Sequence, residues 1–230
     1  MSAPIEPENI AFPNVRAFFT TKNISKNNND IKEVLAREYC VSKDDIYLPV
    51  QKHTSNIHIL ESDRNPVIAD AVVTNHKNIL IGVLVADCVP ILMFDRNKEV
   101  IGAVHAGWRG TSKKILMNAL NAMCSRFNSV PADILLAIGP SIRGCSYEVG
   151  EDVISEVKGA TGEGDYYRRM HGKYFIDLST ANRIQALNMG VSPLNIWQSE
   201  ECTFCSPHKY YSYRYSGGGT GRQGGFIGMW

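Results

Sequence analysis

Two short apolar runs near the middle of the chain dominate its hydrophobic pattern. The first covers residues 79–86 and is followed by Asp87 and Cys88, and the second covers residues 100–104 and is followed by His105. Both runs are rich in Val, Ile and Leu and end at turn residues, which is typical of buried strands. The pattern therefore predicts two neighbouring strands that present a carboxylate, a thiol and an imidazole at their ends.

Strands and helices interleave along the rest of the chain. Apolar runs predict further strands over residues 15–20, 46–51, 70–74, 134–138, 174–178 and 195–198. Helical spacing predicts helices from an Asp30 cap through 39, from a Thr111 cap through 127, over 151–157, and from a Ser179 cap through 189. Because several predicted strands follow one another directly, we expect a single α/β domain, residues 1–230, with mixed β-sheets flanked by helices.

Two segments have an unusual composition. Residues 159–173 are rich in Gly and charged side chains, which predicts a surface loop or lid. Residues 210–215 contain four tyrosines, and we interpret them as a final strand that closes the sheet rather than as a stacking surface for a planar base.

Charge and apolar content exclude several classes of function. The chain has 24 basic and 23 acidic residues and no Lys/Arg run, so we expect no nucleic-acid partner. Its longest apolar stretch is too short to span a bilayer, and the first residues lack the pattern of a secretory signal. We therefore expect a cytoplasmic protein without a membrane partner, whose six cysteines are reduced.

His53, Cys88 and His105 form the central candidate site. Two imidazoles and one thiolate are ligands that suit Zn²⁺, and copper is possible. Three protein ligands with an open fourth position are typical of catalytic zinc. The ligands are 35 and 17 positions apart, which does not resemble the tight pairs of a zinc finger and instead suits a site assembled from separate strand ends.

The same residue types allow two other interpretations. Cys88 and His105 could form a nucleophile–base pair, as in amidases and cysteine proteases. Alternatively, Cys88 could pack as a small apolar residue, with the histidines as ordinary loop residues. The spacing alone does not decide among the three.

Other polar residues are candidates for binding or proton transfer. Asp87 could act as a general base, orient a ligand or cap a turn. Arg109 follows a Gly-containing turn and could hold a phosphate, as could Arg214 and Arg222.

Residues 202–208 carry a second group of possible ligands. Cys202, Cys205 and His208 resemble the first half of a zinc knuckle, but no His or Cys follows them. We therefore favour packing or redox pairing over a second zinc site there.

Several short motifs occur in a fixed order along the chain: Gln51-x-His53, Ala86-Asp87-Cys88-x-Pro90, His105-Ala106-Gly107-Trp108-Arg109-Gly110, Ile138-Gly139-Pro140-x-Ile142, Tyr147-Glu148-Val149-Gly150, Cys202-Thr203, Tyr211-Ser212-Tyr213-Arg214 and Thr220-Gly221-Arg222. This ordered set resembles one known family, the laccase-domain or multi-copper polyphenol oxidoreductase-like proteins, now regarded as purine nucleoside phosphorylases. Each motif alone is modest, but their order over most of the chain is specific.

The resemblance implies a fold related to the cysteine-hydrolase architecture of a deamidating bacterial toxin. It also implies that the family's metal ligands correspond to His53, Cys88 and His105. The implied reaction is phosphorolysis of adenosine, inosine and methylthioadenosine to a free base and ribose 1-phosphate, with adenosine deamination as a further activity. The older family name implies copper and phenolic substrates, but a multi-copper cluster would need more histidines than the six present.

The resulting hypothesis is a zinc-dependent phosphorylase that binds a purine nucleoside and phosphate. Asp87 would move a proton near Cys88 and His105, whereas Gln51 and the three arginines already named would bind substrate or phosphate. We expect a monomer or a weak homo-oligomer. The alternatives are a copper-dependent polyphenol oxidase or a Cys–His hydrolase.

Overall fold

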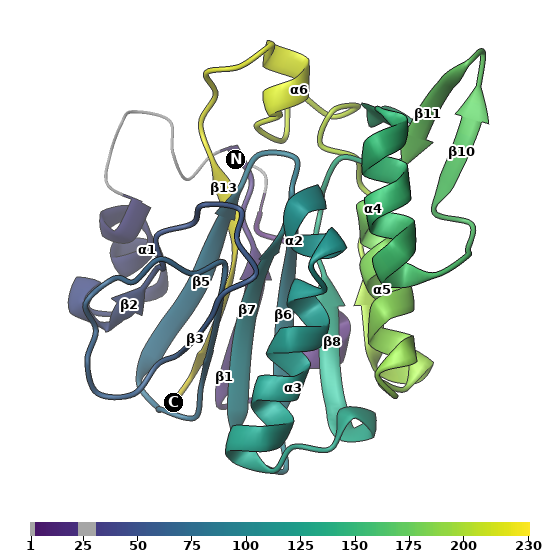
Figure 1. Ribbon diagram of the computed structural model, residues 1–230. Coiled ribbons are helices and arrows are strands. Elements are labelled where there is room, and N and C mark those ends of the chain that lie inside the picture. The colour runs from purple at the N-terminus through teal and green to yellow at the C-terminus, as the bar shows by residue number, and fades with distance from the viewer. Residues whose placement is uncertain (1–2, 23–30) are drawn as a thin grey trace.

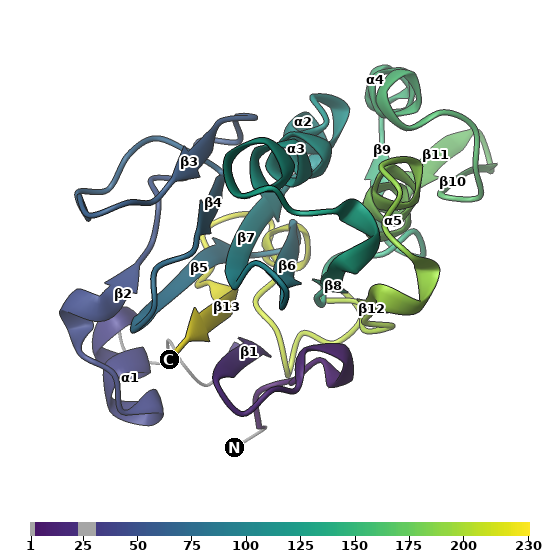
Figure 2. The same cartoon turned by 90° about the horizontal axis from the view of Figure 1, so that it is seen from below.

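The computed structural model of the protein describes residues 3–22 and 31–230 and arranges them in layers. Figure 1 shows the chain from the side. Figure 2 shows a layer of helices over a six-stranded sheet, then a four-stranded sheet, with the helix of residues 31–39 on the outer side. The expectation of an α/β domain with mixed sheets flanked by helices is confirmed.

The six-stranded sheet carries the centre of the fold. Its strands lie in the order β12-β8-β6-β7-β4-β3, with β3–β4 and β8–β12 parallel and the other pairs antiparallel. The strand bounds are β3 Ile57–Ile59, β4 Ala71–Thr74, β6 Val89–Asp95, β7 Val100–Ala106, β8 Ile134–Ile138 and β12 Ile196–Gln198.

The four-stranded sheet has the order β1-β13-β5-β2. Its strands are β1 Val15–Phe19, β2 Ile46–Tyr47, β5 Ile79–Val85 and β13 Gln223–Met229. The sequence analysis predicted that the two apolar runs form neighbouring strands. This prediction is wrong, because β5 and β7 belong to different sheets. Ile81 and Val83 of β5 and Ile101 and Ala103 of β7 share the apolar core between the two sheets. The ends of the two strands still meet, because residues 86–88 carry the chain from one sheet to the other.

Within residues 3–22 and 31–230, a small third sheet and six α-helices complete the fold. The sheet has the order β10-β11-β9, with β9 Glu148–Val149, β10 Tyr167–Met170 and β11 Lys173–Ile176. The α-helices are α1 Ile31–Tyr39, α2 Trp108–Ser112, α3 Ile115–Phe127, α4 Glu151–Thr161, α5 Leu178–Asn188 and α6 Tyr213–Ser216, and the 3₁₀ helices are η1 Glu8–Ile10, η3 Lys43–Asp45, η4 Pro131–Asp133 and η5 Pro193–Asn195. Within the described ranges, no helix has the length and apolar character needed to cross a membrane.

Side chains point alternately to the two faces of each strand, so a separate apolar core forms on each face of the sheets. Val104 of β7 points toward α3, where it packs with Leu116 and Leu120. On the outer face of the four-stranded sheet, Leu80 packs with Leu35 of α1. Because the central strands are covered on both faces, they are apolar at nearly every position.

Two helix starts differ from the sequence prediction. The predicted helix 111–127 is two helices, since α2 begins at Trp108 and Lys114 adopts a left-handed conformation (φ 60°) between α2 and α3. Asp177, not Ser179, caps α5, because its side chain accepts a hydrogen bond from the N–H of Thr180 at 3.0 Å. The predicted cap Asp30 lies outside the described residues.

Strand β6 was missed because Pro90 interrupts its apolar run. A proline lacks the N–H that a central strand donates to its neighbour. Here the ladder between β6 and β8 begins with Ile91 opposite Ile138, so Pro90 lies just beyond it. The Pro90 carbonyl still accepts from the N–H of Gly139 at 2.8 Å. The strands predicted before residue 200 are confirmed, although β2 already ends at Tyr47 and β11 ends at Ile176.

Two segments of unusual composition are structured differently from the prediction. Residues 159–173 contain the end of α4 and most of the β10–β11 hairpin, rather than an irregular loop. The tyrosines at 210–215 do not form the final strand, because Ser212 caps the short helix α6 and the last strand begins only at Gln223.

Candidate functional site

The eight residues that the sequence analysis selected all line one cavity of about 690 Å³. The cavity lies where β5 and β7 end, beside α6. Its predicted lining residues are Gln51, His53, Asp87, Cys88, His105, Arg109, Arg214 and Arg222. Trp108, Tyr147 and Tyr213 add aromatic surface that the analysis did not assign to a site. Pockets of this size accommodate ligands of the size of a nucleoside.

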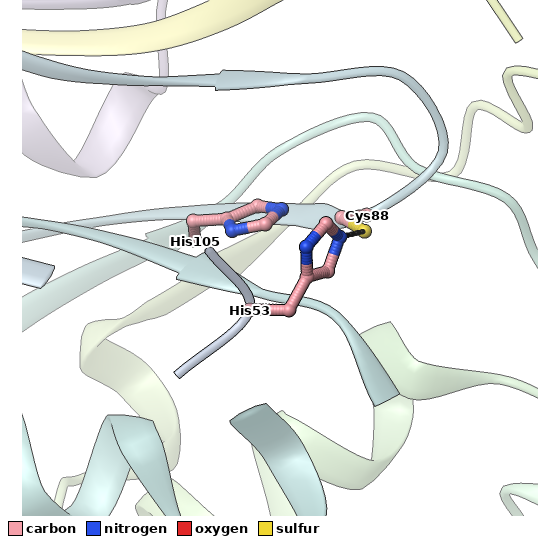
Figure 3. A group of neighbouring side chains, drawn as sticks. All are labelled: His53, Cys88 and His105. Carbon is pink, nitrogen blue, oxygen red and sulfur yellow. Dashed lines mark hydrogen bonds between the residues drawn. The ribbon is translucent and has the colours of Figure 1, made fainter. Parts of the chain in front are cut away.

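His53, Cys88 and His105 converge at one end of this cavity (Figure 3). His53 Nε2 lies 3.8 Å from Cys88 Sγ, and the candidate ligand atoms of the three residues are all within 4.8 Å of one another. A tetrahedral zinc ion with ordinary Zn–N and Zn–S distances separates its nitrogen and sulfur ligands by about 3.6 Å. The His53–Cys88 separation is therefore close to that of two zinc ligands, and His105 lies near enough to be the third.

Asp70 is the most important site residue that the sequence analysis missed. It is fully buried, and its Oδ1 accepts a hydrogen bond from His105 Nδ1 at 2.7 Å. The same carboxylate accepts from the backbone N–H groups of His53 and Thr54, at 3.1 and 2.6 Å. Asp70 thus positions two of the three candidate ligands and leaves Nε2 of His105 for a metal. The sequence offered one sign of this role, because Asp70 directly precedes the apolar residues 71–73 of a predicted strand.

The thiol and the imidazole shift each other's protonation. Burial alone would raise the pKa of Cys88, but His105 and His53 lower it to about 6. Burial would lower the pKa of His105, but Cys88 and Asp70 raise it to about 9. In the metal-free site these shifts favour a thiolate–imidazolium pair at neutral pH, and a metal ion would displace the proton from Nε2 of His105. Cys88, His105 and Asp70 also have the order of a nucleophile, a base and an orienting carboxylate.

Gly107 allows the chain to pass close to the cluster. A Cβ atom at this position would lie 3.0 Å from Cys88 Sγ and 3.1 Å from His53 Cδ2. Both distances are shorter than ordinary van der Waals contact, so a side chain here would push the ligands apart. The glycine is required by space and not by its backbone angles, since its φ is −75°.

Asp87 anchors three segments around the cavity. Its Oδ1 accepts from Thr203 Oγ1 at 2.6 Å, and its Oδ2 accepts from the N–H of Arg214 at 2.7 Å. Its carbonyl accepts from the N–H of Ile142, and its backbone is left-handed, with φ 88°. The residue therefore joins the 86–88 crossover to α6 and to the Thr203 turn. Its proton-transfer role stays a prediction.

The three arginines of the cavity are held in place without carboxylate partners. Arg109 stacks on Trp108 at 4.4 Å, and Arg214 lies 5.0 Å from the ring centre of Tyr147. Arg222 donates to the carbonyl of Thr220 at 2.7 Å. Among residues 3–22 and 31–230, none of the three arginines forms an ion pair. A guanidinium has five N–H donors, so each arginine retains donors for an anion.

Gln51 lies in the cavity wall with its amide already engaged. Its Nε2 donates to the carbonyl of Leu84, and its Oε1 accepts from the N–H of Leu84, both at 2.8 Å. The side chain therefore continues the hydrogen bonding of β5 where the strand ends. Its predicted contact with substrate stays a prediction.

Comparison with known proteins identifies the family. The family described as multi-copper polyphenol oxidoreductase laccase matches residues 18–230. The chain belongs to this family. The resemblance found in the sequence motifs is thereby confirmed.

Similar proteins carry two kinds of name. The chain is 40% identical to a purine nucleoside phosphorylase of Aquifex aeolicus, over 75% of this chain and 77% of that protein. It is 35% identical to a purine nucleoside phosphorylase of Clostridium acetobutylicum, over 89% of this chain and 84% of that protein. It is also 34% identical to adenosine deaminase RL5 of an unknown prokaryotic organism, over 84% of this chain and 78% of that protein.

Solved structures show the same fold. YlmD from Geobacillus stearothermophilus superimposes with a TM-score of 0.87 at 29% identity, covering 95% of this chain and 93% of that one. The Bacillus licheniformis hypothetical protein YfiH gives a TM-score of 0.87 at 27% identity, covering 94% and 93%. The relation to cysteine-hydrolase architecture stays a prediction.

Proposed function

We propose that this protein is a purine nucleoside phosphorylase that uses the cavity around Cys88. The observation that carries the proposal is the combination, in one cavity, of a His–Cys–His cluster, three arginines without carboxylate partners and three aromatic side chains. The names of the similar proteins support the same reaction. The proposed substrates are adenosine, inosine and methylthioadenosine.

The reaction replaces one bond at the ribose with another. The bond between the anomeric carbon and the purine nitrogen breaks, a phosphate oxygen bonds to that carbon, and the purine leaves with a proton. The arginines suit the phosphate, because guanidinium groups bind it through paired N–H donors. Trp108, Tyr147 and Tyr213 offer faces on which a purine can stack.

His53, Cys88 and His105 would hold a zinc ion, with Asp70 fixing the tautomer of His105. When bound, zinc would supply Lewis acidity at this end of the cavity. Asp87 is the proposed proton carrier. Both of its oxygens accept hydrogen bonds, which hold the carboxylate in place at the cavity wall.

Adenosine deamination is a second candidate activity of the same cavity. A His–Cys–His set with an open position beside a carboxylate is the kind of arrangement that zinc deaminases use. The similarity to adenosine deaminase RL5 supports it. A copper oxidase is less favoured, because the cavity gathers only two of the six histidines of the chain.

The test is to incubate purified protein with adenosine, with and without phosphate, and to identify the products by mass. Cys88→Ala tests the site, and Cys124→Ala, a half-buried thiol in α3, is the matched control. Phosphate-dependent adenine and ribose 1-phosphate, lost only in Cys88→Ala, would support the phosphorylase. Inosine formed without phosphate would make the deaminase the main activity. Unchanged adenosine would refute both and leave the Cys–His hydrolase to test.

A further inference from the structure

A second group of cysteines lies outside the cavity described above. Cys145 belongs to the loop between β8 and β9, whereas Cys202 and Cys205 belong to the turn that follows β12. The fold brings their three sulfur atoms within 4.8 Å of one another. Cys145, and not His208, therefore joins the Cys-x-x-Cys pair, which is why the sequence alone showed only half of a site.

The spacing of the sulfur atoms matches a metal site better than a disulfide. Cys145 Sγ and Cys205 Sγ are 3.6 Å apart. In tetrahedral zinc coordination with ordinary Zn–S bonds, two sulfurs are about 3.8 Å apart. A disulfide requires about 2.05 Å. The thiols are thus already at the separation that a shared zinc ion requires.

A backbone N–H group and a β-bridge hold the Cys202 thiol in a position suited to metal binding. Its side chain is buried, and its Sγ accepts a hydrogen bond from the N–H of Arg143 at 3.4 Å. N–H donors around a sulfur stabilise the thiolate that a metal needs. A parallel bridge between Ser141 and Cys202 fixes the two segments against each other. The guanidinium of Arg143 is held separately by Asp177, at 2.8 Å.

An ion can reach this group from solvent. Cys145 and Cys205 are exposed, and Cys145 and Cys202 line a second cavity of about 520 Å³. This cavity shares no lining residue with the one around Cys88. Because two of the three thiols are exposed, water can supply the fourth ligand. Ser146 Oγ also lies 3.2 Å from Cys205 Sγ.

We propose that Cys145, Cys202 and Cys205 bind a second zinc ion through three thiolates. The ion ties the β8–β9 loop to the turn after β12. Both segments reach the first cavity, because Tyr147 lines it and Thr203 binds Asp87. The second site therefore supports one wall of the first, and its existence does not depend on the proposed function.

The experiment counts metal ions and identifies their ligands. Protein purified anaerobically with a reductant is loaded with Zn²⁺ or Co²⁺, dialysed, and compared with Cys88→Ser and with Cys145→Ser/Cys205→Ser. We expect about two ions per chain in the parent protein and about one in each variant. The sulfur-to-cobalt charge-transfer absorption should fall more in the double variant, because that site has three thiolates and the other has one.

A second measurement does not require the double variant to fold. Zinc X-ray absorption on Cys88→Ser should show a shell dominated by sulfur, because only the three-cysteine site then retains its thiolates. One ion per chain that is lost in Cys88→Ser and kept in the double variant would overturn the proposal. A Cys145–Cys205 disulfide in the anaerobically purified protein, detected as a mass lower by about 2 Da, would also overturn it.

Discussion

His105 Nδ1 donates a 2.7 Å hydrogen bond to Oδ1 of Asp70, and both side chains are buried. Burial would raise the pKa of Asp70, but the hydrogen bonds from His105 and Thr54 hold it well below its usual range. The carboxylate is therefore ionised and can only accept, so Nδ1 carries the proton and Nε2 is available to a metal. One side chain thus sets both the orientation and the tautomer of a candidate ligand.

Asp70→Asn should weaken zinc binding at the Cys88 site about ten- to hundredfold, because an amide neither fixes the tautomer nor supplies the charge. Competition with a chelator of known affinity measures the change. Asp95→Asn is the matched control, since Asp95 is equally buried and its Oδ1 accepts from the N–H of Asn97, at the other end of β6. Equal losses of zinc affinity in both variants would mean that the effect is general destabilisation.

Cys88 should be more acidic than Cys124, a thiol outside the cavity, in protein treated with a chelator. Its pKa of about 6 lies below the usual value, so the reactive thiolate is present above pH 6 and is lost as the pH falls through 6. Alkylation of chelator-treated protein by iodoacetamide, followed by peptide mass, should show this midpoint. Cys124, whose pKa is raised by burial, should react only at alkaline pH.

His105→Ala should slow the alkylation of Cys88 at pH 7 about tenfold, because the imidazolium that stabilises the thiolate is removed. The midpoint should then move to higher pH. An unchanged midpoint would show that His105 does not control the thiol, and would count against the ion pair described here.

Gly107→Ala tests the space beside the candidate metal ligands. The added methyl group would lie 3.0 Å from Cys88 Sγ, so we expect zinc affinity and activity to fall at least tenfold while the protein stays folded. Gly159→Ala is the matched control, because that helical position is open and alanine favours a helix by about 0.5–1 kcal/mol. Zinc titration and thermal unfolding of both variants separate the two effects. Full zinc affinity in Gly107→Ala would refute the close approach.

The three candidate ligands could be selected from the sequence because they lie at or near the ends of strongly apolar strands. Runs such as residues 79–85 and 100–106 stand out, and His53, Cys88 and His105 are reactive residue types near predicted strand ends. Their assignment to two sheets could not be predicted, because a strand covered on both faces is apolar throughout and its pattern does not say which sheet it joins.

The hydrogen bonds that support the candidate site could not be predicted from the sequence, for a different reason. Asp70 lies 35 positions from His105, and Thr203 lies 116 positions from Asp87. Aspartate and threonine are common in loops, so nothing local marks them as partners of a site. Cys145 was missed as a partner of Cys205 because 60 residues separate them, and the pairing of β8 with β12 and the bridge at Ser141 bring their segments together.

Arg109→Met should raise the KM for phosphate about ten- to hundredfold, because one charge-assisted interaction is lost from the phosphate. The KM for the nucleoside should change little, since methionine retains the apolar contact with Trp108. Arg64→Met is the control, because Arg64 pairs with Asp45 on the surface and does not line the cavity.

The Arg109 substitution also shows whether Arg109 contacts the phosphate or the nucleoside. Initial rates measured with each substrate varied in turn separate the two KM values. A rise in the nucleoside KM alone would place Arg109 against the purine or ribose and leave phosphate to Arg214 and Arg222. Arg109→Lys refines the result, because lysine keeps the charge but cannot form the paired hydrogen bonds of a guanidinium. If lysine restores only part of the phosphate affinity, both the charge and the paired geometry of Arg109 contribute to binding.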